Sequence, residues 1–143
     1  MTTQTPSRSI APAAPTWRLR IAAVLAAVIG AVVIYAIAKA AGADFLVDQH
    51  NGKGAQAIGI GAVIGMALII PLLGWGLMAL LEKFNRNPVK IWTIVAGVVT
   101  VLSYLLLLVV GAAAGTKLSL FLLHTFVAAV LFTLLRRGAG KTA

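Results

Sequence analysis

Two side chains in otherwise apolar stretches have the chemistry to bind a ligand or move a proton: His124 and Tyr104. His124 lies inside the run LSLFLLHTFVAAVLFTLL, and Tyr104 lies inside the apolar run before it. Ionisable groups inside a membrane are costly and often functional. If the two runs form an antiparallel helical hairpin, we predict a hydrogen bond between the Tyr104 hydroxyl and the His124 imidazole. The pair could relay protons or contact a ligand, or a neutral His124 could only fix the packing of two helices.

A second group of polar residues lies in the segment DFLVDQHNGKG, which begins at Asp44. Asp44, Asp48 and His50 are carboxylates and an imidazole, which can together bind a divalent cation. A loop offers no fixed geometry, and Lys39 and Lys53 flank it, so we predict no metal site there. The chain contains no cysteine, which excludes disulfides, thiolate metal sites and thiol chemistry. We therefore expect no catalytic residues and no cofactor, and we do not expect an enzyme.

Backbone features are concentrated in the apolar stretch that follows this loop. Gly61 and Gly65 form a small-xxx-small motif, which lets two helices approach closely. The partner helix could belong to the same chain or to a second copy. Pro71, which cannot donate a backbone hydrogen bond, predicts a kink.

The composition identifies the elements that must position these residues. Hydrophobic residues make up 61% of the 143 residues and charged residues only 10%, whereas a soluble domain has roughly 25% charged residues. A chain this small could not hide so much apolar surface from water. Apolar runs of about 20 residues match the hydrocarbon thickness of a bilayer. We therefore predict an all-α, integral membrane four-helix bundle over residues 17–137, with helices at about 20–41, 56–81, 88–113 and 117–135.

The segments outside these helices predict the ends and the turns. Residues 1–16 should form a disordered cytoplasmic tail and residues 138–143 a second cytoplasmic tail. Asn87-Pro88 should begin the third helix, and Thr116 should cap the fourth. Phe45 to Val47 should lie at the lipid interface. A cleaved signal peptide is the alternative for the first apolar run, but the run is longer than the usual signal region.

Basic residues predict that both termini are cytoplasmic. Such residues are enriched in the cytoplasmic loops of membrane proteins. With the N-terminus inside, nine lie inside: Arg8, Arg18, Arg20, Lys83, Arg86, Lys90, Arg136, Arg137 and Lys141. Three lie outside: Lys39, Lys53 and Lys117. The net charge of +9 then faces an anionic leaflet, so the lipid bilayer is the expected partner and nucleic acid is not. Trp17 and Trp92 should anchor the inner interface, where Glu82 should be solvated.

Four segments carry a resemblance to a known family. They are GADFLV, GAQAIGIGAVIG, GWGLMALLE and LSLFLLHTFVAAVLFTLLRR, which together extend to Arg137. With these segments in this order, the chain resembles a family of small four-helix integral membrane proteins of unknown function found in actinobacteria. The resemblance implies a four-helix fold and a plasma-membrane location, and it matches His124 to a histidine of the family's last helix. It implies no activity.

These observations favour an uncharacterised multi-pass plasma-membrane protein. We expect an accessory or structural component of a membrane assembly, either part of a larger complex or an oligomer of this chain. The alternative is a small oligomeric transporter or channel subunit with His124 and Tyr104 in its pathway.

Overall fold

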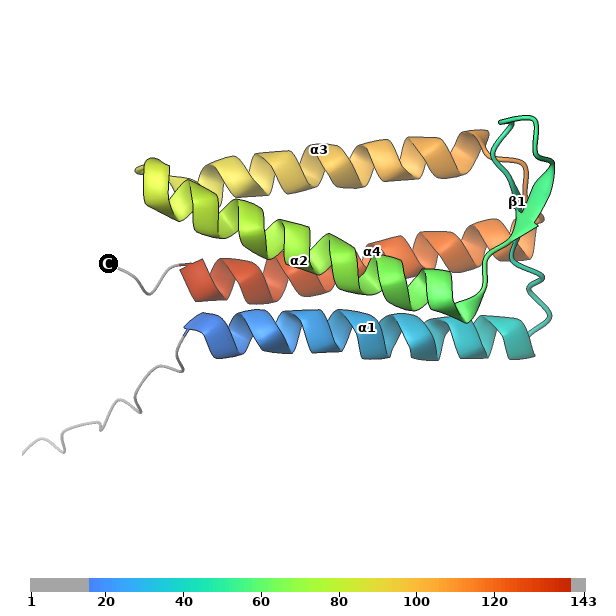
Figure 1. Ribbon diagram of the computed structural model, residues 1–143, viewed down its shortest axis with the longest axis horizontal. Coiled ribbons are helices and arrows are strands. Elements are labelled where there is room, and N and C mark those ends of the chain that lie inside the picture. Colours follow the sequence, from blue (N-terminus) through green and yellow to red (C-terminus); the bar gives the residue numbers. More distant parts are fainter. Residues whose placement is uncertain (1–15, 140–143) are drawn as a thin grey trace, which may run out of the picture.

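The computed structural model describes residues 16–139, and these residues form four long helices and one short β-hairpin (Figure 1). The helices are α1 (Thr16–Ala40), α2 (Ile60–Phe84), α3 (Pro88–Val109) and α4 (Ala114–Ala139). The strands are β1 (Leu46–Asp48) and β2 (Ala55–Ala57). The prediction of four packed, apolar helices is confirmed, whereas the predicted tails lie almost wholly outside the described residues.

Each of the four helices is long and apolar enough to cross a membrane. Helices α1 and α2 each contain 25 residues, which at about 1.5 Å per residue exceeds a hydrocarbon thickness of about 30 Å. Large apolar side chains cover the outer surfaces of the helices. Examples are Ile94 and Leu106 of α3, which are 58% and 67% exposed. Such a surface suits lipid and not water.

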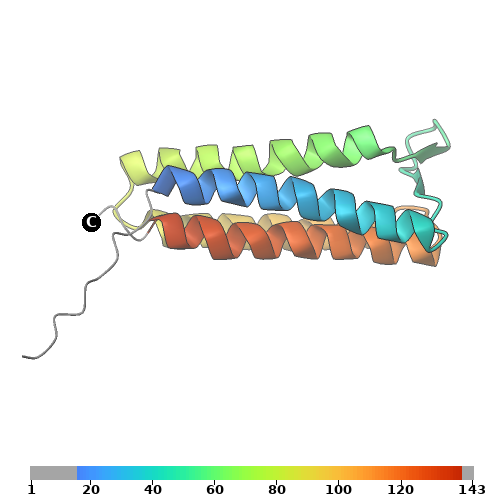
Figure 2. The same cartoon turned by 90° about the horizontal axis from the view of Figure 1, so that it is seen from below.

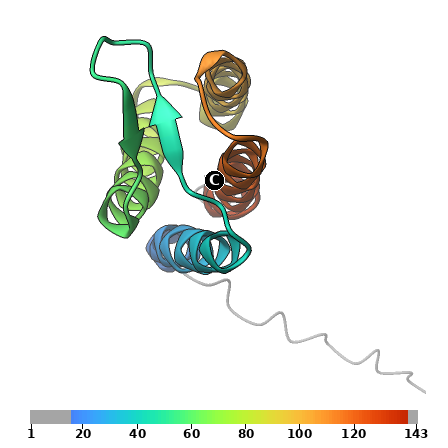
Figure 3. The ribbon, with the colours of Figure 1, turned by 90° about the vertical axis from the view of Figure 1, so that its right-hand side faces the viewer.

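The helices lie side by side, with α4 in contact with the other three. Figures 1 and 2 show the alternating directions of the helices, and Figure 3 shows the bundle from the end that carries the hairpin. We call this the hairpin end, and we call the opposite end, where α1 begins and α4 ends, the terminal end. Helix α2 leans across the bundle, so that it lies near α3 at the terminal end and near α1 at the hairpin end (Figures 1 and 3).

The hairpin closes one end of the bundle through backbone pairing. Strands β1 and β2 are antiparallel, with Val47 opposite Gln56. Asp48 also pairs with Gly111: the Asp48 N–H donates to the Gly111 carbonyl at 2.7 Å, and the Gly111 N–H donates back at 2.9 Å. This pairing draws residues 110–113 out of the helix, so α3 ends at Val109, four residues before the predicted end.

The side chains of β1 and its flanks belong to the core, which corrects their predicted place at the lipid interface. Phe45 is fully buried and Val47 is 5% exposed, whereas Leu46 between them points outward. Tyr35 of α1 stacks on Phe45 with ring centroids 4.5 Å apart, and its hydroxyl donates to the Ile58 carbonyl at 3.1 Å. The alternation along the strand therefore inserts two apolar side chains between the helix ends.

A second cluster of buried side chains fills the terminal end. Its members are Met78, Trp92, Leu131 and Leu135. Trp92 is 1% exposed and packs edge-on against Phe132. The predicted interfacial role of Trp92 is therefore wrong, because the indole points between α2 and α4. Trp17 is 52% exposed, as an interfacial anchor requires.

Candidate functional site

The predicted hydrogen bond between Tyr104 and His124 is not formed. The Tyr104 hydroxyl instead lies 2.9 Å from the hydroxyl of Thr125. Because the Thr125 hydroxyl donates to the Phe121 carbonyl, Tyr104 is the donor of this bond. His124 is the residue before Thr125 on α4, and one residue rotates a helix by about 100°, which turns the imidazole away from Tyr104.

His124 nevertheless occupies a distinctive position in the middle of α4. It lies ten residues after the start of the helix at Ala114, or about 15 Å along the axis, near the middle of the helix. Leu120, one turn before it, and Leu131, two turns after it, are buried, yet the His124 side chain is exposed. Its Nδ1 atom lies 2.7 Å from the Leu120 carbonyl, and within residues 16–139 its Nε2 atom has no hydrogen-bond partner. The imidazole is thus exposed in the single chain although buried residues of α4 lie one turn before it and two turns after it.

The small-xxx-small motif does not lie against a helix of this chain. A Cβ atom added at Gly61 or at Gly65 would meet no described atom within 4 Å. Gly30 of α1, which follows Ala26 by four residues, makes the close contact instead. A Cβ atom there would lie 2.0 Å from Cε1 of Phe126, so α1 and α4 approach at a site where only glycine fits.

Pro71 lies in the buried stripe of α2, and the helix continues through it from Ile60 to Phe84. Proline has no N–H, so the hydrogen bond that would reach the Ala67 carbonyl is absent. One turn later, the Gly74 carbonyl accepts a hydrogen bond of 2.9 Å from the Trp92 indole. This bond ties the second half of α2 to α3, while the predicted kink at Pro71 stays a prediction.

An ion pair joins α1 to α2 at the terminal end. The Arg20 guanidinium donates to the Glu82 carboxylate, and their side chains are 9% and 21% exposed. The Arg20 Nε atom is buried without a partner among the described residues. The expectation that Glu82 is solvated is therefore wrong, because Arg20 covers it. The sequence hint was that Glu82 is the single acidic residue of its half of the chain.

At the hairpin end, Asp44 and Thr116 connect the loop after α1 to the first turn of α4. The buried Thr116 hydroxyl donates to Asp44 Oδ1 at 2.6 Å and accepts the Phe45 N–H at 3.1 Å. This hydrogen bond from Thr116, and a second from the Leu46 N–H, lower the pKa of the Asp44 carboxyl below its ordinary value. Thr116 therefore anchors a loop and does not cap its own helix, which begins two residues earlier.

Asp44, Asp48 and His50, which could together bind a cation, make hydrogen bonds to other groups instead. Asp44 is engaged by Thr116, and Asp48 accepts the His50 N–H at 2.8 Å, while the His50 ring stays 4.0 Å from that carboxylate. Within residues 16–139, no three His, Asp or Glu side chains lie close enough together to hold a metal ion.

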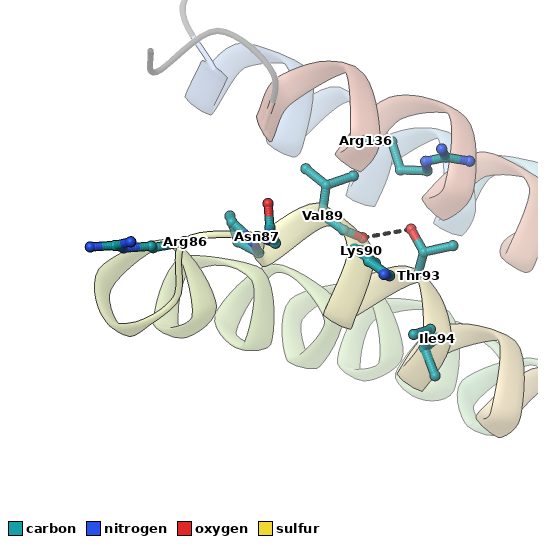
Figure 4. A pocket seen from close by; sticks show the side chains of 8 residues that line it. Arg86, Asn87, Val89, Lys90, Thr93, Ile94 and Arg136 are labelled. Carbon is teal, nitrogen blue, oxygen red and sulfur yellow. Dashed lines mark hydrogen bonds between the residues drawn. The ribbon is translucent and has the colours of Figure 1, made fainter.

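A shallow pocket of about 560 Å³ lies at the terminal end between the start of α3 and the end of α4. We call it the terminal basic pocket; its lining residues are Arg86, Asn87, Pro88, Val89, Lys90, Thr93, Ile94 and Arg136. Figure 4 shows Arg136 on α4 opposite the first turn of α3, which carries Lys90, while Arg86 extends away from both. Sequence reasoning counted these three cations only as topology signals and missed that the fold gathers them.

Comparison with known proteins gives a family and nothing more specific. Residues 11–141 match a family described as a family of unknown function (DUF6069). No curated protein and no solved structure matches the chain.

Proposed function

The chain belongs to this family of unknown function, and from its fold and charges we propose that it is a multi-pass plasma-membrane protein that serves as an accessory or structural component of a membrane assembly. Both termini face the cytoplasm in this proposal. The argument for orientation is charge, because Arg18, Lys83 and Arg86 lie at the terminal end together with the end of α4.

The observation that carries the accessory role is the exposed imidazole of His124. A polar group without a hydrogen-bond partner in an apolar medium costs about 1–3 kcal/mol. His124 lies near the middle of an apolar helix and is exposed in the single chain. A transmembrane helix of another subunit, with a hydrogen-bonding side chain near its middle, would cover the imidazole and remove that cost.

Photocrosslinking in native membranes tests this proposal. Phe121 lies three residues before His124 and is 44% exposed, so p-benzoylphenylalanine replaces it with little change in shape. We expect illumination to give a discrete adduct with a membrane protein. The adduct should fall several-fold when His124→Leu is added, because leucine needs no hydrogen-bonding partner.

The matched control carries the same crosslinker in place of Phe84, which is 71% exposed at the terminal end of α2. This position should give no adduct that depends on His124. Two differently tagged copies of the chain then separate self-association from a different partner. Adducts with lipid alone, or a protein adduct that His124→Leu leaves unchanged, would contradict the proposal.

A small oligomeric transporter or channel subunit is the second candidate, and the same exposed imidazole is what favours it. The Tyr104 hydroxyl is hydrogen-bonded to Thr125, whereas the Nε2 atom of His124 has no hydrogen-bond partner among residues 16–139. His124 is therefore the residue of the pair that is available to line a pathway. A pH-dependent flux through liposomes that is lost on His124→Ala would support transport. A flux no greater than that of empty vesicles would exclude it.

A further inference from the structure

We propose that the terminal basic pocket binds the phosphate of an anionic phospholipid headgroup. Its cations come from separate parts of the chain, with Arg86 in the α2–α3 connection, Lys90 on α3 and Arg136 on α4. The fold therefore brings Arg136 close to two cations, Arg86 and Lys90, that precede it by 50 and 46 residues. Arg136 of α4 lies opposite the turn of α3 that carries Lys90, and Arg86 extends away from both (Figure 4).

These charges lack a counterion among residues 16–139. The sequence contains three acidic residues. Asp44 and Asp48 lie at the hairpin end, and Glu82 is engaged by Arg20 between α1 and α2. No carboxylate of the described residues forms an ion pair with the cations of the pocket. Guanidinium and ammonium groups bind phosphate by charge-assisted hydrogen bonds.

The start of α3 adds to the positive potential in the pocket. Asn87 precedes the helix but makes no side-chain hydrogen bond to its first turn. The first N–H groups of a helix carry a partial positive charge. Because Asn87 leaves this turn uncapped, the N–H groups beside Lys90 favour an anion in the same place.

The apolar part of the lining favours a lipid over a soluble phosphate. Ile94 lies one turn beyond Lys90 and is 58% exposed, and it begins the apolar outer surface of α3 that continues through Val98 and Val101. A headgroup phosphate held by Lys90 and Arg136 would place its acyl chains along this surface. Basic pockets between transmembrane helices bind anionic headgroups in this way. A volume of about 560 Å³ also lies in the range of about 300–1,000 Å³ found for ligand pockets.

The test measures lipid binding to the full chain in neutral detergent by native mass spectrometry. The probe is dioctanoylphosphatidylglycerol, with dioctanoylphosphatidylcholine as the zwitterionic control and glycerol 1-phosphate as the lipid-free control. We expect the anionic lipid to bind at least about tenfold more tightly than either control. The choline ammonium of the zwitterionic lipid opposes the cations of the pocket, and glycerol 1-phosphate lacks the acyl chains that would lie along the apolar surface of α3.

Two double variants remove the same number of charges from the same end of the bundle. Lys90→Gln with Arg136→Gln removes cations of the pocket, whereas Arg18→Gln with Lys83→Gln removes exposed cations outside it. Both variants lose general attraction to anionic lipid, so the difference between them reports the pocket. We expect the pocket variant to bind the anionic lipid at least about tenfold more weakly than the control variant.

Equal weakening in the two variants, or no weakening in either, would overturn the site. Glycerol 1-phosphate that binds as tightly as the lipid, and depends on the same two residues, would overturn the lipid assignment. If the pocket double variant fails to fold, Arg136→Lys, which keeps the charge but not the two-pronged geometry, replaces it and should weaken binding about threefold or more. This binding is measured in detergent, so an error in the proposed orientation or in the accessory role would leave the result unchanged.

Discussion

Gly30→Ala is the substitution for which the structure gives the sharpest expected effect. An added Cβ atom would lie 2.0 Å from Cε1 and 2.2 Å from Cζ of Phe126. Ordinary van der Waals contact begins at 3.4 Å, so the ring or the helices must move by 1.4 Å, the difference between 3.4 and 2.0. Overpacking of this kind costs about 1–3 kcal/mol. Alanine recovers up to about 1 kcal/mol through its higher helix propensity. We therefore expect a net loss of about 1–2 kcal/mol in the free energy of unfolding.

The assay is unfolding of the detergent-solubilised chain by increasing amounts of sodium dodecyl sulfate, followed by circular dichroism. Gly61→Ala is the matched control, because it adds the same atom where nothing lies within 4 Å. It should leave stability unchanged or raise it slightly. Combining Gly30→Ala with Phe126→Leu should cost less than the sum of the single variants, by about 1 kcal/mol, because the smaller side chain vacates the contested space. Strict additivity, or a Gly30→Ala chain as stable as the unmodified protein, would refute the packing argument.

Three further predictions concern the ends of the bundle. Glu82→Gln should lower the free energy of unfolding by about 2 kcal/mol, which is less than the loss of a fully buried ion pair would cost because Glu82 is 21% exposed. Adding Arg20→Met to this variant should recover part of the loss. Unfolding titrations measure both effects. The hydrogen bond from Thr116 lowers the pKa of Asp44. The stability that this bond contributes is therefore complete above the ordinary pKa of 3.8 and is lost as the pH falls through the lowered pKa of the folded state. Thr116→Val should flatten this acid dependence in melting experiments, and an unchanged profile would contradict the prediction. Single cysteines introduced by Asn51→Cys and Asn85→Cys should distinguish the two faces of the membrane. An impermeant maleimide should label only the Asn51→Cys variant in whole cells, and the reverse pattern would overturn the orientation.

The helices were predictable from the sequence because hydrocarbon thickness imposes a length on any spanning segment. The ends of the helices were less predictable where distant residues intervene. Residues 110–113 are apolar and continue the pattern of α3, but the pairing of Gly111 with Asp48 removes them from the helix. No local signal marks that contact, since the two residues are separated by α2 and α3.

Side-chain partners were harder to predict than helix positions. The depth of the residues in the hairpin predicted His124 as the partner of Tyr104, but the rotation of α4 places the neighbouring Thr125 there instead. The hydroxyls of Ser103 and Ser119 donate to carbonyls of their own helices. A hydroxyl inside an apolar helix can satisfy itself in this way, so its presence in a sequence does not specify a neighbouring helix.

Small residues illustrate the same limit. The motif at Gly61 and Gly65 shows where a helix could be approached, and the structure leaves both positions open. Gly30 stands alone in an alanine-rich stretch, and its role depends on Phe126, which is nearly a hundred residues away. Only the pairing of α1 with α4 distinguishes a required glycine from a tolerated one.

The distribution of fixed contacts also indicates which helix can adapt to a partner. Helix α1 is tied to α2 by the ion pair of Arg20 and to α4 by the close contact at Gly30. Helix α3 has a single buried residue, Trp92, near its start, and its later half is tied to α4 by the Tyr104 hydroxyl. A partner that packs against the bundle would therefore shift α3 at less cost than α1, because fewer buried side chains hold α3 in place.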